Sequence, residues 1–227
     1  MKLRFIRAEK VVGDVVKFMF EPEQALDWTP GQYMHYLFPH ENEDDRGHER
    51  WFTISSAPFE GHVAISTRIS EQGSSFKRAL QNLQPGDEIE ADGPEGDFTL
   101  VDTDRNYIFV AGGIGITPFR SILYDAYNKG MNLKLKLLYA TRNHDIPFKD
   151  ELDQFAGNNP NMSIEYIVDP DSIDKELLGQ RIAEVDNPIV YVSGPKPMVK
   201  SFAKELAELG LHKDDIKTDD FPGYEAY

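Results

Sequence analysis

The chain has 227 residues, enough for one large domain or two modest ones. Hydrophobic residues make up 40% and charged residues 28%, as in soluble globular proteins, and the formal net charge of −15 disfavours nucleic-acid partners and anionic membrane surfaces. The absence of cysteine excludes disulfides, thiolate metal sites, a cysteine nucleophile and an iron–sulfur cluster bound by the chain's own thiolates.

The amino terminus and the hydropathy pattern bear on location. The first ten residues interleave charged and apolar side chains, which predicts no secretory signal. No apolar run approaches the ~20 residues needed to span a bilayer. We therefore expect a cytoplasmic protein without membrane insertion.

The first part of the chain, residues 1–103, is expected to form a small antiparallel β-barrel. Short apolar or aromatic runs alternate there with turns rich in glycine and proline. The Gly13-Asp14 pair between two valine runs predicts a hairpin. Further strands are expected at residues 33–38, 52–55 and 62–69, a charged loop at 41–50, and a helix capped by Ser74 or Ser75 at 76–83.

The second part, residues 104–227, alternates strands and helices. This pattern predicts a doubly wound parallel α/β sheet that is covered on both faces, with the domain boundary in the polar stretch 102–105. Strands are expected at residues 107–111, 133–139, 164–168 and 189–192, and helices at 119–128, 148–155 and 198–209.

A glycine loop follows the first strand of this second part. Gly112, Gly113 and Gly115 permit a tight turn and a close approach of the backbone to an anion. Thr117 is expected to cap the next helix and Pro118 to be its first residue, so that free N–H groups form a phosphate site. Taken alone, the loop also fits a glycine-rich turn without a ligand.

The run from Arg50 to Ser56 combines three kinds of binding group. Arg50 can bind a phosphate through two N–H groups. Phe52 can lie against a planar ring, and the hydroxyl of Thr53 can hydrogen-bond to a heteroatom of that ring. In isolation such residues are more often ordinary core and strand residues.

Further segments extend these two motifs into one ordered set. The pattern Arg50-x-Phe52-Thr53-x-x-Ser56 precedes Gly112-Gly-x-Gly115-x-Thr117-Pro118. The other members are Pro30-Gly31-Gln32-Tyr33, Gly73-Ser74-Ser75-Phe76, Pro85-Gly86-Asp87, Gly93-Pro94-x-Gly96-x-Phe98 and Ser193-Gly194-Pro195-Lys196-Pro197-Met198. The set spans essentially the whole chain and resembles the ferredoxin–NADP reductase superfamily.

This resemblance implies an FAD-binding barrel joined to an NAD(P)-binding domain. Arg50 would hold the flavin phosphates, helped by Ser74, Ser75 and the backbone of Gly73. FAD is favoured over FMN, which some members of the family use.

The resemblance also assigns the residues around the flavin ring. Phe52, where the family usually has Tyr, would pack against the isoalloxazine, and Thr53, where it usually has Ser, would place its hydroxyl near flavin N5. Ser56 belongs to the same motif. Thr67 and Arg68 are similar to family positions that follow the flavin's linker.

The nucleotide side is assigned in the same way. The pyrophosphate would be received by Gly112, Gly113, Gly115, Thr117 and Pro118, and the nicotinamide would be bordered by Ser193, Gly194, Pro195 and Met198. The chain end resembles members that close on an aromatic residue covering the flavin. Phe221 is the first choice, Tyr224 and Tyr227 are alternatives, and a solvated acidic tail is the other interpretation.

Two departures from the family pattern affect the chemistry. Ser193 stands where the family usually has Cys, so a small hydrogen-bonding group replaces a thiol. Asp169 and Asp171 follow the third strand of the nucleotide domain, where NADPH-specific members carry Ser and Arg. These carboxylates would repel a 2′-phosphate, although Arg142 could bind one, so the sequence leans to NADH.

The implied activity is hydride transfer from nicotinamide C4 to flavin N5, followed by electron transfer to a separate acceptor protein or small molecule. Thr53 and Phe221 would act beside the reacting rings. The six histidines have no metal-like spacing, so no metal site is expected. The alternative is a non-catalytic flavin- or nucleotide-binding subunit of a larger redox complex.

Overall fold

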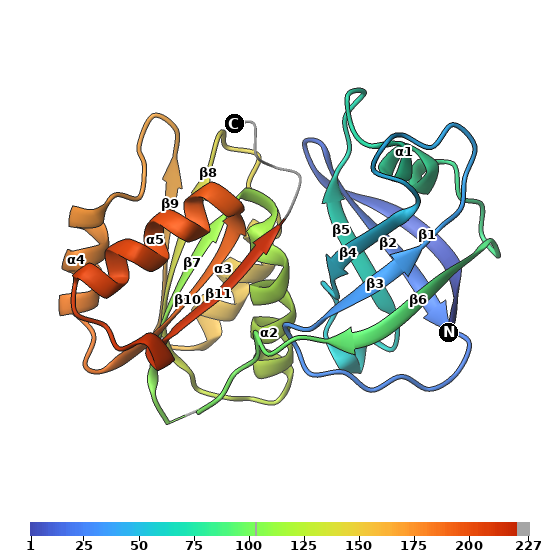
Figure 1. The fold of residues 1–227 in the computed structure, drawn as a ribbon. Helices are drawn as coiled ribbons and strands as arrows, with labels where there is room; N and C mark the ends of the chain where they lie inside the picture. Colours follow the sequence, from blue (N-terminus) through green and yellow to red (C-terminus); the bar gives the residue numbers. More distant parts are fainter. Residues whose placement is uncertain (103, 222–227) are drawn as a thin grey trace.

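The computed structural model describes residues 1–102 and 104–221, with Phe221 described by its backbone alone. An antiparallel and a parallel domain lie side by side (Figure 1). The first contains β1 (Lys2–Val12), β2 (Val15–Pro22), β3 (Tyr33–Leu37), β4 (Glu49–Thr53), η1 (Pro58–Glu60), β5 (Val63–Arg68), α1 (Ser75–Gln81) and β6 (Glu88–Glu95). The second contains β7 (Asn106–Gly112), η2 (Gly113–Gly115), α2 (Ile116–Asn128), β8 (Lys134–Thr141), α3 (Lys149–Asn158), β9 (Met162–Val168), α4 (Lys175–Ala183), β10 (Pro188–Pro195), α5 (Lys196–Glu208), η3 (Lys213–Asp215) and β11 (Ile216–Phe221).

The antiparallel domain is one curled sheet with the strand order β4-β3-β6-β1-β2-β5. The predicted hairpin at Gly13-Asp14 joins β1 to β2. Just past β4, the N–H of Ser55 donates to the carbonyl of Ala64 in β5 at 2.9 Å, which brings the two edge strands together. Among the described strands, β4 itself pairs only with β3, so the barrel has an open seam along β4 and β5.

The barrel core is mainly aromatic and aliphatic. Phe18 and Phe20 of β2 point inward at alternate positions, as expected for a strand with one buried face. Phe76 and Leu80, four residues apart on α1, are fully buried in the same core. Helix α1 therefore closes one end of the barrel as part of its core.

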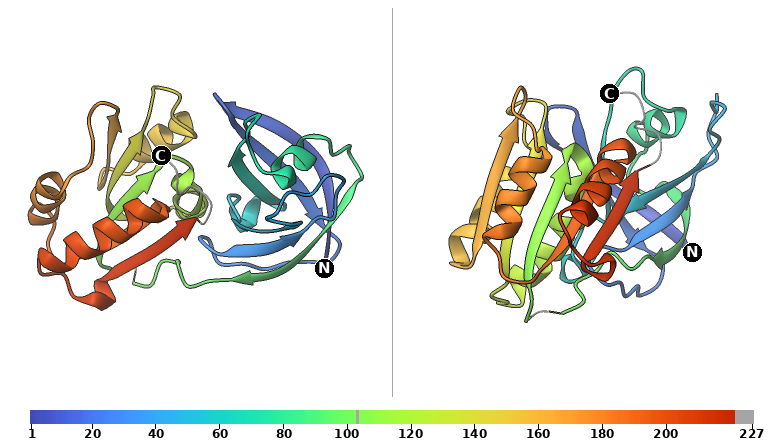
Figure 2. Two further views of the ribbon diagram at one scale, coloured as in Figure 1. Left: turned by 45° about the horizontal axis from the view of Figure 1, so that its top comes forward. Right: turned by 60° about the vertical axis from the view of Figure 1, so that its left-hand side comes forward.

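The parallel sheet has the order β11-β10-β7-β8-β9 and is covered on both faces (Figure 2). Along β7, Tyr107 and Phe109 pack into the cluster that includes α2 and α3, whereas Ile108 and Val110 pack into the cluster that includes α4 and α5. Successive strand residues point to opposite faces, so a continuous apolar run marks a strand buried on both. The predicted fold class, an antiparallel barrel plus a doubly wound parallel domain, is confirmed.

Several elements differ from the predictions. Strand β1 already begins at Lys2, β4 includes Glu49 and Arg50 from the expected loop, and β6, α4 and β11 were not predicted. Each of these segments lies where polar residues interrupt the apolar pattern. In α4, for example, Leu178 is the residue that is buried, so the helix has little apolar periodicity.

Two features of the whole chain are the domain boundary and the length of its apolar helices. The domain boundary between residues 103 and 104 stays a prediction; β6 ends at Glu95 and β7 begins at Asn106. Within the described ranges, no helix has the length and apolar character needed to cross a bilayer.

Candidate functional site

A cavity of about 550 Å³ lies along the open seam of the barrel, and we call it the seam cavity. It is bounded by β4, β5, the loop before α1 and the beginning of α2. The predicted residues that line it are Arg50, Phe52, Thr53, Thr67, Arg68, Gly73, Ser74, Thr117 and Arg142. The unpaired edges of β4 and β5 thus place residues from distant segments around one space.

Arg50 lines the seam cavity, and both of its terminal guanidinium nitrogens already bind groups of the protein. Its Nη1 donates to the carbonyls of Arg46, Gly47 and Glu49 at 2.8, 3.0 and 2.6 Å, and its Nη2 lies 3.4 Å from Asp44 Oδ1. Burial lowers the pKa of Arg50, and the nearby charge of Arg46 acts in the same direction. The buried Nε has no partner among the described residues. Such an orphan donor costs about 1–3 kcal/mol, so its presence fits an anionic ligand oxygen in the seam cavity.

The beginning of α1 meets the prediction only in part. Ser74 lines the seam cavity and caps the helix by accepting from the N–H of Lys77 at 3.5 Å. Ser75 is held instead by Asp44: its Oγ accepts from the Asp44 N–H at 3.0 Å, and its own N–H donates to Asp44 Oδ2 at 2.6 Å. The structure does not bring Ser75 to the seam cavity, because the Asp44 loop uses both its polar groups.

Phe52 and Thr53 occupy the β4 side of the cavity. Phe52 is half-buried and packs against Tyr36 and Phe76, with ring centroids 5.9 and 5.8 Å apart. Thr53 is buried and, like Thr67 of β5, lines the seam cavity. An aromatic surface and a hydroxyl therefore border the same space, which suits a planar heterocycle.

Ser56, by contrast, does not line the seam cavity. Its Oγ donates to the carbonyl of His62 at 2.7 Å and accepts from the N–H of Ala64 at 3.0 Å. This hydroxyl holds the chain after β4 against β5, and a cofactor contact of Ser56 stays a prediction.

A second cavity, of about 370 Å³, lies at the carboxyl ends of the parallel strands, and we call it the sheet-end cavity. Strand order reverses between β7 and β10, the usual place for ligands in such sheets. The predicted residues lining it are Arg68, Gly112, Gly113, Arg142, Pro195 and Met198, and Asp169 and Asp171 also contribute. Two carboxylates and two arginines thus face the same space, including Asp169, Asp171 and Arg142, which the sequence analysis places near the nucleotide.

The three glycines of the loop have different roles. A Cβ on Gly112 would overlap Sδ of Met198, and one on Gly115 would overlap the carbonyl of Ser193. These two positions let the loop pack directly on the end of β10. Gly113, at φ +54°, has the side open to the cavity, where the nearest atom to an added Cβ is Nη2 of Arg68 at 3.7 Å. Gly113 is therefore the loop residue whose backbone a ligand can approach most closely.

The start of α2 corrects one prediction. The helix begins at Ile116 after Gly115, so Thr117 and Pro118 lie inside its first turn and Thr117 is not the N-cap. The Thr117 Oγ1 donates to the carbonyl of Ile114 at 3.1 Å, and the residue faces the seam cavity. Pro118 is buried and lines neither cavity, because it packs within the domain.

The end of β10 places two predicted residues behind the sheet-end cavity. Ser193 is fully buried, and its Oγ donates to Asp219 Oδ2 of β11 at 3.4 Å. Burial, reinforced by the charge of Asp220, raises the pKa of Asp219 to about 7. Gly194 packs against Gly112 and Met198, so it shapes the cavity without lining it.

The predicted aromatic cover falls mainly outside the described residues. The backbone of Phe221 pairs with Pro195 at the end of β11, which sets its position beside the sheet-end cavity. The side chain of Phe221, and Tyr224 and Tyr227 entirely, lie outside the described part of the chain.

The two cavities adjoin, because Arg68, Ile114 and Arg142 line both. The seam cavity also holds residues that the sequence analysis did not select, including Arg46, Trp51 and Lys77. Its lining carries five cationic side chains, namely Arg46, Arg50, Arg68, Lys77 and Arg142, against Asp14 and Glu49. In a chain of net charge −15, this local excess of positive charge suits phosphate groups.

Comparison with known proteins fits the same division. Residues 2–100 match the family described as oxidoreductase FAD-binding domain, and residues 109–204 match the oxidoreductase NAD-binding domain. The chain belongs to the ferredoxin–NADP reductase superfamily. As a superfamily member it shares its fold with ferredoxin-NADP+ reductase from Plasmodium falciparum, at a TM-score of 0.82 and 18% identity over 97% of this chain and 95% of that one.

Two relatives of this superfamily member are similar in sequence. The toluate 1,2-dioxygenase electron transfer component of Pseudomonas putida is 32% identical over 199 residues, 82% of this chain and 56% of that protein. A component of the Na(+)-translocating NADH-quinone reductase of Pseudomonas aeruginosa is 28% identical over 231 residues, 91% of this chain and 56% of that protein. The chain spans little more than half the length of these relatives.

The family matches bear on the predicted cofactors. FAD and a pyridine nucleotide are confirmed as the ligands of the two domain families. The seam cavity, with the orphan Nε of Arg50 and its cationic lining, fits a flavin with phosphates. The sheet-end cavity, with the open backbone at Gly113, fits a dinucleotide. The individual contacts of the predicted residues with either ligand remain predictions.

Proposed function

We propose that the chain is a flavin-dependent NAD(P)H oxidoreductase that passes electrons through FAD to a separate acceptor. The observation that carries this proposal is the junction of the two cavities at Arg68, Ile114 and Arg142. Ligands in adjoining spaces can meet without crossing bulk water. When bound, FAD and the nucleotide supply the hydride and electron chemistry themselves.

The chain's own groups would bind and orient these ligands. Arg50 is fixed by backbone carbonyls, so its free Nε would hold a flavin phosphate with little loss of side-chain entropy. Thr53 would direct its hydroxyl to the flavin ring from the buried side of β4. Gly113 would admit the dinucleotide to the loop after β7.

NADH is the proposed nucleotide. Asp169 and Asp171 line the sheet-end cavity and would repel a 2′-phosphate, although Arg142 attracts anions there. The similarity to a protein named NADH-quinone reductase supports the same choice.

Nucleotide choice is tested by comparing kcat/KM for NADH and NADPH. We expect a higher kcat/KM for NADH than for NADPH. We expect the double variant Asp169→Asn, Asp171→Asn to lower the ratio of the NADH value to the NADPH value. The control is Asp186→Asn, an exposed position of the same domain outside the cavity lining. A preference for NADPH in the unaltered chain would contradict the assignment.

The proposed acceptor is a separate redox protein or small molecule. Two electrons leave each NAD(P)H, so one turnover reduces two one-electron acceptors or one two-electron acceptor. The similarity to an electron transfer component of a dioxygenase supports a protein as the acceptor. A panel of one-electron proteins, quinones and small dyes would identify the class.

The competing function is a passive flavin- or nucleotide-binding subunit. Purified protein that retains FAD, and whose flavin absorbance is bleached by NADH without oxygen, would establish the enzyme. Bound flavin that NADH does not bleach would favour the passive subunit. Protein without flavin affinity would contradict the enzyme and leave only a passive nucleotide-binding subunit. A cytoplasmic location stays a prediction that fractionation of the source cells would test.

A further inference from the structure

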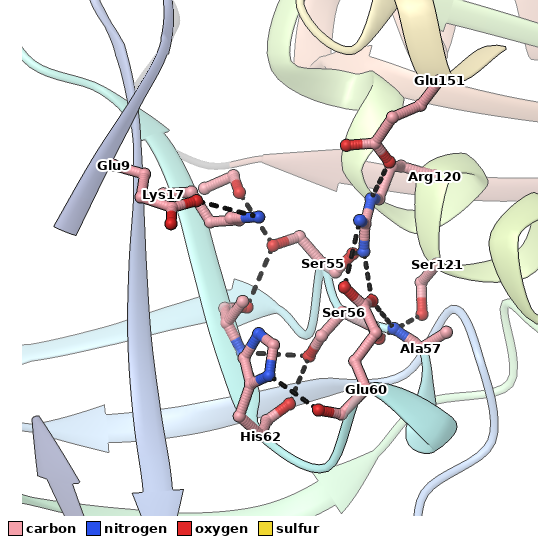
Figure 3. Close-up of polar contacts among 12 residues, drawn as sticks. Glu9, Lys17, Ser55, Ser56, Ala57, Glu60, His62, Arg120, Ser121 and Glu151 are labelled. Atoms are coloured by element: carbon pink, nitrogen blue, oxygen red, sulfur yellow. Dashed lines mark hydrogen bonds and ion pairs between the residues drawn. The ribbon is translucent and has the colours of Figure 1, made fainter. Parts of the chain in front are cut away.

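One buried cation joins the two domains. Arg120 of α2, with a side chain 2% exposed, binds both carboxylate oxygens of Glu60 in η1, with Nη2 to Oε1 at 3.1 Å (Figure 3). Its Nη1 also donates to the carbonyl of Ser55 at 3.1 Å, and its Nε donates to Glu151 of α3 at 2.9 Å. The guanidinium therefore connects two segments of the barrel with two helices of the parallel domain.

Neighbouring contacts reinforce this connection. The Oγ of Ser121 donates to the carbonyl of Ser56 at 2.7 Å. The Tyr124 ring lies 4.6 Å from the guanidinium carbon of Arg120 and 4.8 Å, edge-on, from the Phe59 ring. Polar and aromatic contacts thus share one small interface.

The residues of this interface follow the cavity-lining segments closely in the chain. Residues 55–60 follow β4, which carries Thr53 into the seam cavity. Arg120 lies five residues after Gly115, at the end of the loop that borders the sheet-end cavity. Any shift at this contact would therefore move the two cavities relative to each other.

The chemistry of the contact favours positioning over stability. Burial alone would lower the pKa of Arg120, but its hydrogen bond to Glu60 and the charges of Glu151 and Glu60 raise it, so the group stays charged. Desolvation of buried ions offsets most of their attraction, so such a pair adds little net stability. A forked guanidinium–carboxylate contact does fix the relative orientation of the two groups that it joins.

We propose that Arg120 and Glu60 form an interdomain latch that sets the placement of the sheet-end cavity against the seam cavity. Arg120 is a positioning residue, because it touches neither cavity. Its effect on transfer between the ligands rests on the proposed function; its effect on domain placement does not.

The test of domain placement uses the flavin-free chain. Because the sequence has no cysteine, spin labels can be attached at Glu90→Cys in the barrel and Lys204→Cys in α5, both exposed. We expect a narrow distance distribution between the labels in the otherwise unaltered chain, and a broadened or shifted one in Arg120→Met. Arg120→Lys keeps the charge without the fork and should also broaden it; it serves if the Met variant fails to fold.

The chain offers a matched control. Arg181 binds Glu165 through Nε at 2.7 Å and Nη2 at 3.1 Å, and Glu184 through Nη1 at 2.9 Å, all within the parallel domain. Arg181→Met removes a comparable arginine with two acidic partners. It should leave the distance distribution narrow, whatever it does to thermal stability.

A second readout tests the consequence for transfer. In Arg120→Met we expect the affinities for FAD and for NADH to change less than about 2-fold, while flavin reduction at saturating NADH slows by about 10- to 100-fold. The latch proposal would be overturned if the Arg120 variants gave the same distance distributions and flavin reduction rates as Arg181→Met. If the flavin is never reduced by NADH, the proposed function fails and the distance measurement still decides the latch.

Discussion

Thr53 is the residue on which the proposed chemistry depends most directly. It is buried on β4 and borders the seam cavity, so its hydroxyl has few competing water partners. We expect Thr53→Ala to slow flavin reduction by about 10-fold, the effect of losing one hydrogen bond of ~1.5 kcal/mol, and Thr53→Ser to restore most of the rate. Stopped-flow reduction by NADH measures this, and an unchanged rate in Thr53→Ala would remove the assigned role.

Asp219 gives the protein a pH dependence of stability. Burial raises the pKa of this carboxyl from 3.8 to about 7, so the folded state favours its protonated form. The contribution of this carboxyl to the free energy of unfolding is therefore fully present below about pH 4. It is lost as the pH rises to about 7, by up to about 4 kcal/mol, because the unfolded chain ionises first. Compared with the unaltered chain, Asp219→Asn should gain thermal stability progressively over that range. A stability difference that stays constant with pH would contradict this.

Local motifs predicted some site residues and failed for others for a physical reason. Arg50 and Thr53 both line the seam cavity because β4 is an edge strand whose unpaired side borders that space. Ser75 does not, because Asp44, 31 residues earlier in the chain, binds its N–H and hydroxyl. A contact between segments so far apart leaves no local signal in the sequence.

At the scale of elements, the packing of the glycine loop on the end of β10 determines the sheet-end cavity. A Cβ on Gly115 would overlap the Ser193 carbonyl, which is fixed by strand pairing. We expect Gly115→Ala to destabilise the protein by about 1–3 kcal/mol and to weaken NADH binding. Gly157→Ala in α3 is the control, since its Cβ meets no atom within 4 Å and alanine favours helix. Equal stability of the two variants would show that the loop can move away.

The predictability of the elements follows their burial. Strand β7 is a continuous apolar run because both its faces are covered, and the sequence identifies it to within one residue at each end. Helix α4 and strand β11 have few buried residues, so their patterns are weak without knowledge of their neighbours. The barrel's closure depends on pairings between distant strands, such as β1 with β6, that no local pattern encodes.

At the scale of the molecule, a chain of net charge −15 holds a cavity whose charged lining residues are mostly cationic. An acidic acceptor approaching from solution would be repelled, and salt would screen that repulsion. We therefore expect KM for an acidic ferredoxin to fall several-fold between about 0.05 and 0.3 M salt, and KM for a basic haem protein to rise. An uncharged quinone serves as the control. The opposite responses would locate the docking surface on a basic patch.

The central claim is that nicotinamide and flavin meet where the two cavities adjoin. Its most direct test is anaerobic stopped-flow reduction of the FAD-loaded protein by NADH and by NADH deuterated at the transferred position of C4. We predict a single bleaching phase that is slowed by deuterium, as direct hydride transfer requires. No bleaching, or bleaching at the same rate with both nucleotides while the transfer step limits the rate, would contradict the claim.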